Sequence, residues 1–124
     1  VCGLILFSFL AAAAQTVVPL RRIQGEGNLS PLVGKIVSTR GVVTARVERG
    51  FYIQTPDGET DQDAKTSEGI FVFTNQTDAN VKIGDAVEVS GTVGEYRPRT
   101  QRYALTLTQI VNPRVKVVSS NNPL

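Results

Sequence analysis

Arginines and tyrosines cluster in one short segment of the chain. It reads Tyr96-Arg97-Pro98-Arg99-Thr100-Gln101-Arg102-Tyr103, so three cations fall within six residues. Guanidinium groups bind phosphates and aromatic rings stack on bases, a combination typical of single-stranded nucleic-acid binding. The same residue types also occur without a ligand, as exposed arginines that protect a strand edge and tyrosines half-buried at strand ends. The segment favours binding but leaves this second interpretation open.

A second group of candidate residues precedes this segment. Arg46 and Arg49 flank an expected turn, and Tyr52 and Gln54 follow it in alternation with the more apolar Phe51 and Ile53. Alternation in a strand directs successive side chains to opposite faces, so Tyr52 and Gln54 are expected to point outward. The complete predicted nucleic-acid-binding set is Arg46, Arg49, Tyr52, Gln54, Tyr96, Arg97, Arg99, Arg102 and Tyr103.

Carboxylates are concentrated between positions 57 and 68. Five of them (Asp57, Glu59, Asp61, Asp63 and Glu68) stand against one Lys65, while the rest of the chain has 12 basic and 6 acidic residues. The spacing resembles a calcium loop, but Gln62 stands where such a loop has glycine, and no helices are expected around it. The five residues are therefore only a weak calcium candidate, and a solvated acidic loop is expected. The same carboxylates are suitable ligands for the Mg²⁺ of a phosphodiester hydrolase.

Composition excludes several kinds of chemistry. The 124 residues contain no histidine and one cysteine, Cys2, which removes the commonest general base, the commonest zinc ligand and any disulfide framework. With 41% hydrophobic and 19% charged residues and a net charge of +2, the chain has the composition of an ordinary globular domain. We expect a binding domain with no catalytic residue and no cofactor.

Strand patterns dominate the chain from Leu32 onward. A long strand is expected over residues 36–47, bent or bulged at Gly41, followed by strands at 51–54, 70–73 and 85–96. A last alternating strand is expected through Tyr103, Leu105 and Leu107, and residues 115–118 could add an edge strand. The expected core comprises Phe51, Ile53, Val72, Val87, Val89 and Leu105, while Phe71 and Phe73 could face either way. Five evenly spaced strands predict an all-β, five-stranded Greek-key OB-fold barrel, whose first and fourth connecting loops frame its ligand site.

The N-terminal residues form an apolar segment that ends in alanines. Residues 3–14 read GLILFSFLAAAA, followed by Gln15 and Thr16. This pattern is typical of a secretory signal with small residues at its cleavage site, and a short membrane anchor over residues 1–20 is the alternative. Because the first residue is Val1 and no basic residues precede the apolar run, we interpret residues 1–14 as a truncated signal peptide. A lead-in is expected at 15–31, the barrel at 32–112, and a tail or the start of a linker at 113–124.

Three stretches carry a resemblance to a known family. Residues 30–57 (SPLVGKIVSTRGVVTARVERGFYIQTPD), 65–73 (KTSEGIFVF) and 82–96 (KIGDAVEVSGTVGEY) occur in family-like order, preceded by IQGEG at 23–27. Together they resemble the OB-fold (YhcR-type) accessory domain of bacterial extracellular nucleases of the endonuclease/exonuclease/phosphatase family. The resemblance covers residues 23–110. The chain departs from that pattern at residues 63–66 (DAKT).

The resemblance implies a secreted protein, extracellular or periplasmic, in which this domain presents DNA or RNA to a separate catalytic domain of the same polypeptide. That domain would supply the divalent metal, and its Asp, His, Asn and Glu residues have no counterparts here. No catalytic residue is therefore carried over. The alternative is a structural barrel that docks on the catalytic domain or binds cell-surface glycan without touching nucleic acid.

Overall fold

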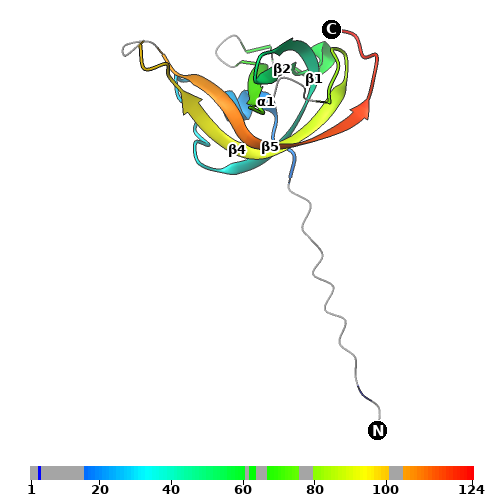
Figure 1. Ribbon diagram of the computed structural model, residues 1–124, viewed down its shortest axis with the longest axis horizontal. Helices are drawn as coiled ribbons and strands as arrows, with labels where there is room; N and C mark the ends of the chain where they lie inside the picture. Colours follow the sequence, from blue (N-terminus) through cyan, green and yellow to red (C-terminus); the bar gives the residue numbers. More distant parts are fainter. Residues whose placement is uncertain (1–2, 4–15, 61, 64–66, 76–79, 101–104) are drawn as a thin grey trace.

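The computed structural model describes residue 3 and residues 16–60, 62–63, 67–75, 80–100 and 105–124. Within these residues a short helix precedes a single sheet of five strands (Figure 1). The elements are α1 (Leu20–Gln24), β1 (Ile36–Val47), β2 (Gly50–Gln54), β3 (Gly69–Phe73), β4 (Ala86–Tyr96) and β5 (Leu107–Ser119), with a 3₁₀ turn at Asp57–Glu59. The predicted predominance of β structure is confirmed.

The sheet closes on itself. Its strand order is β1-β2-β3-β5-β4, and β4 pairs back with β1. Every pairing is antiparallel except that of β3 with β5. The long strand β1 makes this closure possible, because its first half pairs with β4 and its second half with β2. Val42 stands at the change of partner, opposite both Ala86 and Gln54.

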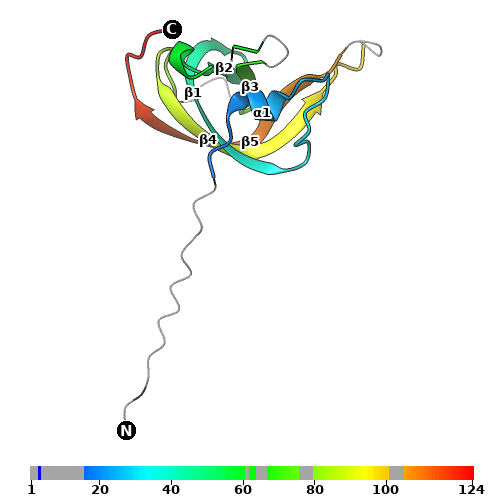
Figure 2. The same ribbon diagram turned by 180° about the vertical axis from the view of Figure 1, so that it is seen from behind.

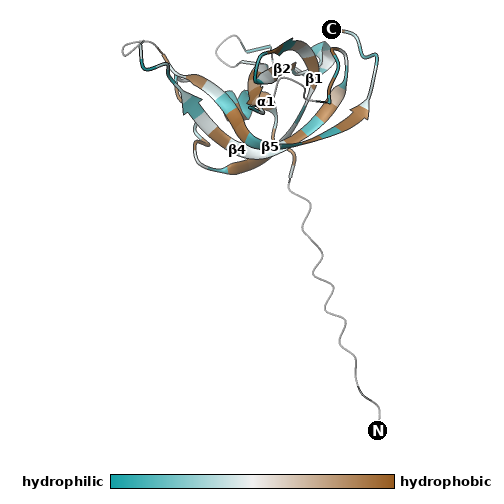
Figure 3. Cartoon of the chain, viewed as in Figure 1, coloured by the Kyte–Doolittle hydropathy of each residue, from teal (hydrophilic) through white to brown (hydrophobic). Residues whose placement is uncertain are grey.

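The interior of the closed sheet is filled by aliphatic side chains and one phenylalanine. Alternate residues of β4 are buried, and Figure 3 shows the resulting alternation of hydrophobic and hydrophilic bands along β4 and β5. Five of the six predicted core residues are buried: Phe51, Ile53, Val72, Val87 and Val89. In β3 the buried residues are Ile70 and Val72, so Phe71 and Phe73 face outward and are only half-buried.

Helix α1 belongs to the core, although its residues were expected to form a linker. Leu20 and Ile23 are both fully buried among the inward-facing strand residues. They lie three positions apart, and this spacing places two side chains on one face of a helix. The helix starts after Pro19 and ends at Gly25, whose φ of 66° suits glycine. Figure 2 shows α1 next to β3, where it covers one end of the barrel interior.

The sequence predicts that the first strand is bent or bulged at Gly41, but the bulge in β1 lies elsewhere. The register against β2 shifts between Val43 and Ala45, so the extra residue is Thr44. Gly41 serves a different purpose, because a Cβ atom there would lie 3.1 Å from both the Gln54 carbonyl oxygen and the Ile53 Cβ. Glycine at this position favours close approach of β2.

The last strand lies further along the chain than predicted. β5 begins at Leu107 and continues to Ser119, and its residues 114–119 pair with β4. The edge strand that the sequence allowed at 115–118, within the expected tail at 113–124, is therefore the end of β5. Leu105 precedes the strand and is 70% exposed, so its assignment to the core was wrong. The inward-facing residues at this end are Thr108 and Ile110, which lie opposite Glu95 and Val93. The sequence pattern predicts the wrong inward-facing residues in the last strand, because a polar pair, Glu95 with Thr108, occupies the inner face.

Apart from Gly3, the predicted signal segment at residues 1–14 lies outside the described residues. In the part of the chain that the structure describes, the helices are too short to cross a bilayer.

Candidate nucleic-acid interface

Two aromatic rings lie side by side on the outer face of β2 and β3. Tyr52 and Phe71 stand directly opposite each other in the antiparallel register. Their ring centroids are 4.9 Å apart and the ring planes are inclined by 44°. Tyr52 is 37% exposed, because the inward positions on either side of it are taken by Phe51 and Ile53. The pair, with Tyr52 exposed and Phe71 half-buried, forms an aromatic platform of the kind on which bases stack.

A glycine beneath the platform fixes the position of the Phe71 ring. Gly50 begins β2, and a Cβ atom there would lie 2.6 Å from Cζ of Phe71 and would also collide with the Val72 carbonyl oxygen. The ring therefore lies against the Gly50 backbone, where any other residue would displace it. Glycine at this position allows close packing of ring on backbone.

The platform borders a shallow hollow of about 390 Å³. The described part of its lining carries no charged side chain: Tyr52 and Phe71 form part of the wall, and Gln54, Ser67 and Leu107 lie around them. Gln24 closes one side, where its Nε2 donates a 2.6 Å hydrogen bond to the Gly69 carbonyl oxygen. The hollow suits a flat group that is apolar on its face and polar at its edge.

Two loops lie at opposite ends of this face. The β1–β2 turn is tied to the end of β3, because the Arg49 carbonyl oxygen accepts hydrogen bonds from the backbone N–H groups of Thr74 (2.9 Å) and Asn75 (3.1 Å). Arg49 itself is exposed with a φ of 71°. The β4–β5 loop leads into Leu107, which lines the hollow near the start of β3. The aromatic platform thus lies between the two loops that carry the predicted arginines.

The predicted residues of the β4–β5 loop are only partly described. Tyr96 is 52% exposed at the end of β4 and pairs with Leu107, which places it on the outer face. Arg97 and Arg99 are exposed. Arg102 and Tyr103 lie outside the described residues.

The structure does not bring Arg46 to the aromatic platform. Arg46 is exposed, but it stands opposite Phe51, whose side chain points into the barrel. Residues directly opposite in a ladder share a face, so Arg46 projects on the side of the hairpin away from Tyr52. Ala45 is the residue of β1 that stands beside Tyr52. The Thr44 bulge causes this change of face.

Several residues of the site were not predicted, among them Phe71, Leu107 and Gln24. Phe71 belongs to the continuously apolar segment 70–73, whose buried face periodicity alone does not decide. Leu107 lies in the expected last strand. Its side chain points outward because the neighbouring Glu95–Thr108 pair points inward. Gln24 reaches the site through α1, which lies in the expected lead-in at 15–31, where no helix was predicted.

The acidic segment lies beside α1. Asp57 and Glu59 are exposed in the 3₁₀ turn, and the Glu59 carbonyl oxygen accepts a 3.1 Å hydrogen bond from Nη1 of Arg21. Asp61 lies outside the described residues. Among the residues that are described, no three His, Cys, Asp or Glu side chains come together in a group suited to a metal ion.

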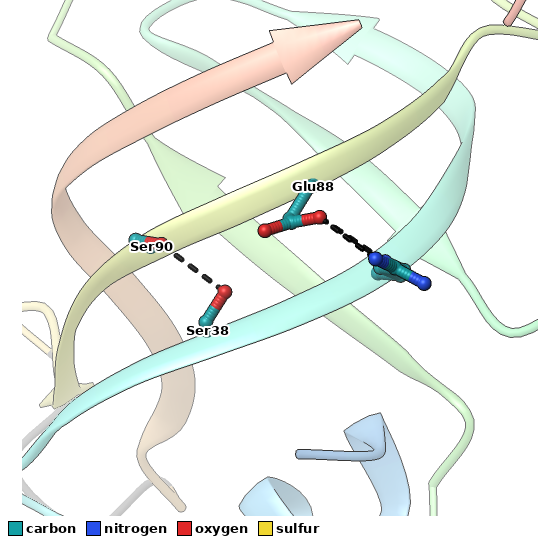
Figure 4. Close-up of polar contacts among 4 residues, drawn as sticks. Ser38, Glu88 and Ser90 are labelled. Atoms are coloured by element: carbon teal, nitrogen blue, oxygen red, sulfur yellow. Dashed lines mark hydrogen bonds and ion pairs between the residues drawn. The ribbon is translucent and has the colours of Figure 1, made fainter. Parts of the chain in front are cut away.

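Polar side chains are arranged differently where β1 pairs with β4. Arg40 contacts Oε2 of Glu88 through both Nε and Nη2, each at 3.1 Å. The Ser90 hydroxyl donates a 3.2 Å hydrogen bond to the Ser38 hydroxyl. Figure 4 shows Ser38, Glu88 and Ser90 with these contacts as dashed lines. The polar side chains of this region therefore bond to one another across β1 and β4.

No protein-family model matches this chain, and no curated protein matches its sequence. The geometry of the chain's own residues is therefore the basis for inferring its function.

Proposed function

We propose that this chain is an OB-fold domain that binds single-stranded nucleic acid, without sequence specificity, across the outer face of β2 and β3. The observation that carries the proposal is the Tyr52–Phe71 platform between two arginine-bearing loops. The strand order β1-β2-β3-β5-β4 with parallel β3 and β5 supports a Greek-key barrel of this type. In OB-folds the β2–β3 face and the β1–β2 and β4–β5 loops are the surface that holds oligonucleotides.

Each part of the surface has a distinct role in this proposal. Tyr52 and Phe71 stack on bases, and Tyr96 extends the aromatic surface toward the β4–β5 loop. Arg97, Arg99 and Arg102 neutralise phosphates at one end of the face, and Arg49 does so at the other. Because stacking is available to every base, binding is tolerant of sequence and depends on salt. Arg46 has no part in the platform.

We further propose that the domain is an accessory part of a secreted nuclease-like protein and delivers its strand to a separate catalytic domain. The sequence resemblance to extracellular nucleases and the signal-like segment at residues 1–14 support this setting. The chain's own residues supply binding, while metal-dependent chemistry belongs to the other domain.

Fluorescence anisotropy with a labelled oligothymidylate tests the proposal, with a neutral oligosaccharide as competitor. We expect binding that weakens steeply with salt and is unaffected by the sugar. Displacement by the oligosaccharide, or no binding at low salt, would instead identify a glycan-binding or docking barrel.

A further inference from the structure

Glu95 is the centre of a hydrogen-bond cluster at the base of the β4–β5 loop. Its Oε1 accepts hydrogen bonds from the Ser30 backbone N–H and from the Thr108 hydroxyl, both at 2.7 Å. Its Oε2 accepts one from the Thr106 hydroxyl at 2.8 Å. All three bonds are part-buried, so one carboxylate joins β4, β5 and the segment before β1.

The cluster lies at the last residue pairs of β4 and β5 before the loop that joins them. Glu95 stands opposite Thr108 on the inner face, and the next pair, Tyr96 with Leu107, is the last before the loop. The carboxylate therefore fastens the two strands at the root of the loop and fixes both to Ser30. That segment is itself ordered, because the Ser30 hydroxyl accepts the Leu32 backbone N–H at 3.0 Å.

The charge of Glu95 is unfavourable for a loop that binds phosphate. Arg97 is two residues away in sequence, and a nearby carboxylate lowers the positive potential that attracts a polyanion. Simple electrostatics thus predicts that removing Glu95 strengthens binding. The three short hydrogen bonds predict the opposite, because three bonds to one side chain hold the loop root in a single orientation.

We propose that Glu95 is a positioning residue: its carboxylate clamps the root of the β4–β5 loop and directs Arg97 and Arg99 toward the Tyr52–Phe71 platform. The consequence for binding rests on the proposed function, whereas the clamp itself does not. Holding a loop in its bound orientation lowers the ordering cost of binding, so losing the clamp should weaken affinity about threefold to tenfold.

Four variants separate the clamp from the charge. Glu95→Ala removes both, while Glu95→Gln removes the charge and keeps an amide that can bond to the same partners. Thr106→Val combined with Thr108→Val removes two donors and leaves the charge unchanged. Glu88→Ala is the control, because it removes a carboxylate from the same strand outside the cluster. Thermal melts identify which variants are folded at the assay temperature.

Two readouts are measured on the full chain: affinity for oligothymidylate, and the rate of trypsin cleavage after Arg99 and Arg102. We expect Glu95→Ala and the double threonine variant to bind about threefold to tenfold more weakly and to be cleaved at least about fivefold faster. Glu95→Gln and Glu88→Ala should bind at least as tightly as the wild type and be cleaved at its rate.

Either of two results overturns the inference. The first is wild-type affinity for oligothymidylate in a folded Glu95→Ala or double threonine variant. The second is trypsin cleavage of such a variant at the wild-type rate. A wild-type chain that binds no oligothymidylate at any salt concentration removes the proposed function instead. The cleavage rates then decide by themselves whether Glu95 is a clamp.

Discussion

Two regions of the same barrel use their side chains in opposite ways. Where β1 pairs with β4, Arg40 contacts Glu88 and Ser90 contacts Ser38, so polar groups bind their cross-strand neighbours. Where β2 pairs with β3, the cross-strand neighbours are Tyr52 and Phe71, and they border a hollow. Cross-strand pairs of either kind stabilise a sheet. Only the second kind also leaves ring surface available to a ligand.

The largest expected effect is on folding stability and concerns helix α1, which contacts β3 in the second region. Ile23→Ala removes a fully buried side chain from α1 and should lower the free energy of unfolding by about 2–5 kcal/mol. Chemical denaturation measures this loss. Arg22→Ala, an exposed change in the same helix, should stay within about 0.5 kcal/mol. Equal effects of the two substitutions would contradict the assignment of α1 to the core.

The next effect tests the aromatic platform directly. Tyr52→Ala should weaken binding of single-stranded DNA by about 1–3 kcal/mol, because one stacking surface is lost. Tyr52→Phe keeps the ring and should keep most of the affinity. Isothermal titration calorimetry compares the two variants. If alanine and phenylalanine behave alike, the ring is not a stacking surface.

The arginine loop should affect salt dependence more than any other feature. Replacing Arg97, Arg99 and Arg102 by alanine should reduce the slope of log affinity against log salt concentration by about two units. Anisotropy titrations over a range of salt concentrations give the slope. Unchanged slope with retained affinity would remove these arginines from the interface.

The smallest effect is expected in the first region. Arg40→Ala breaks a largely exposed ion pair and should change stability by no more than about 1 kcal/mol. The salt slope for DNA binding should equal that of the wild type, since Arg40 lies away from the proposed face. A slope reduced by about one unit would show that β1 and β4 also contact the strand.

The sequence predicted four of the five strands well, because their patterns are locally decisive. Val87 and Val89 alternate with polar residues, and Tyr52 alternates with the buried Phe51 and Ile53. The fifth strand was misplaced because alternation assumes an apolar inner face, and here Glu95 and Thr108 bond to each other inside. Such a pair becomes visible only once β4 and β5 are in register.

The candidate site was predictable only in part, for a related reason. The outward direction of Tyr52 follows from local alternation. Its contact with Phe71 depends on the register of β2 with β3, which are joined by a long loop rather than a tight turn. Arg46 projects away from Tyr52 because a single extra residue, Thr44, reverses the alternation beyond it. Helix α1 has too few residues for a helical period to stand out.

We propose above all that the outer face of β2 and β3 binds single-stranded nucleic acid. The most direct test is anisotropy of labelled oligothymidylate with the full chain and with Tyr52→Ala, each at about 50 and 200 mM salt. The claim predicts wild-type binding that is at least tenfold weaker at the higher salt, and a further loss in the variant at both. Absence of binding at the lower salt, or equal affinities of the two proteins, would contradict it.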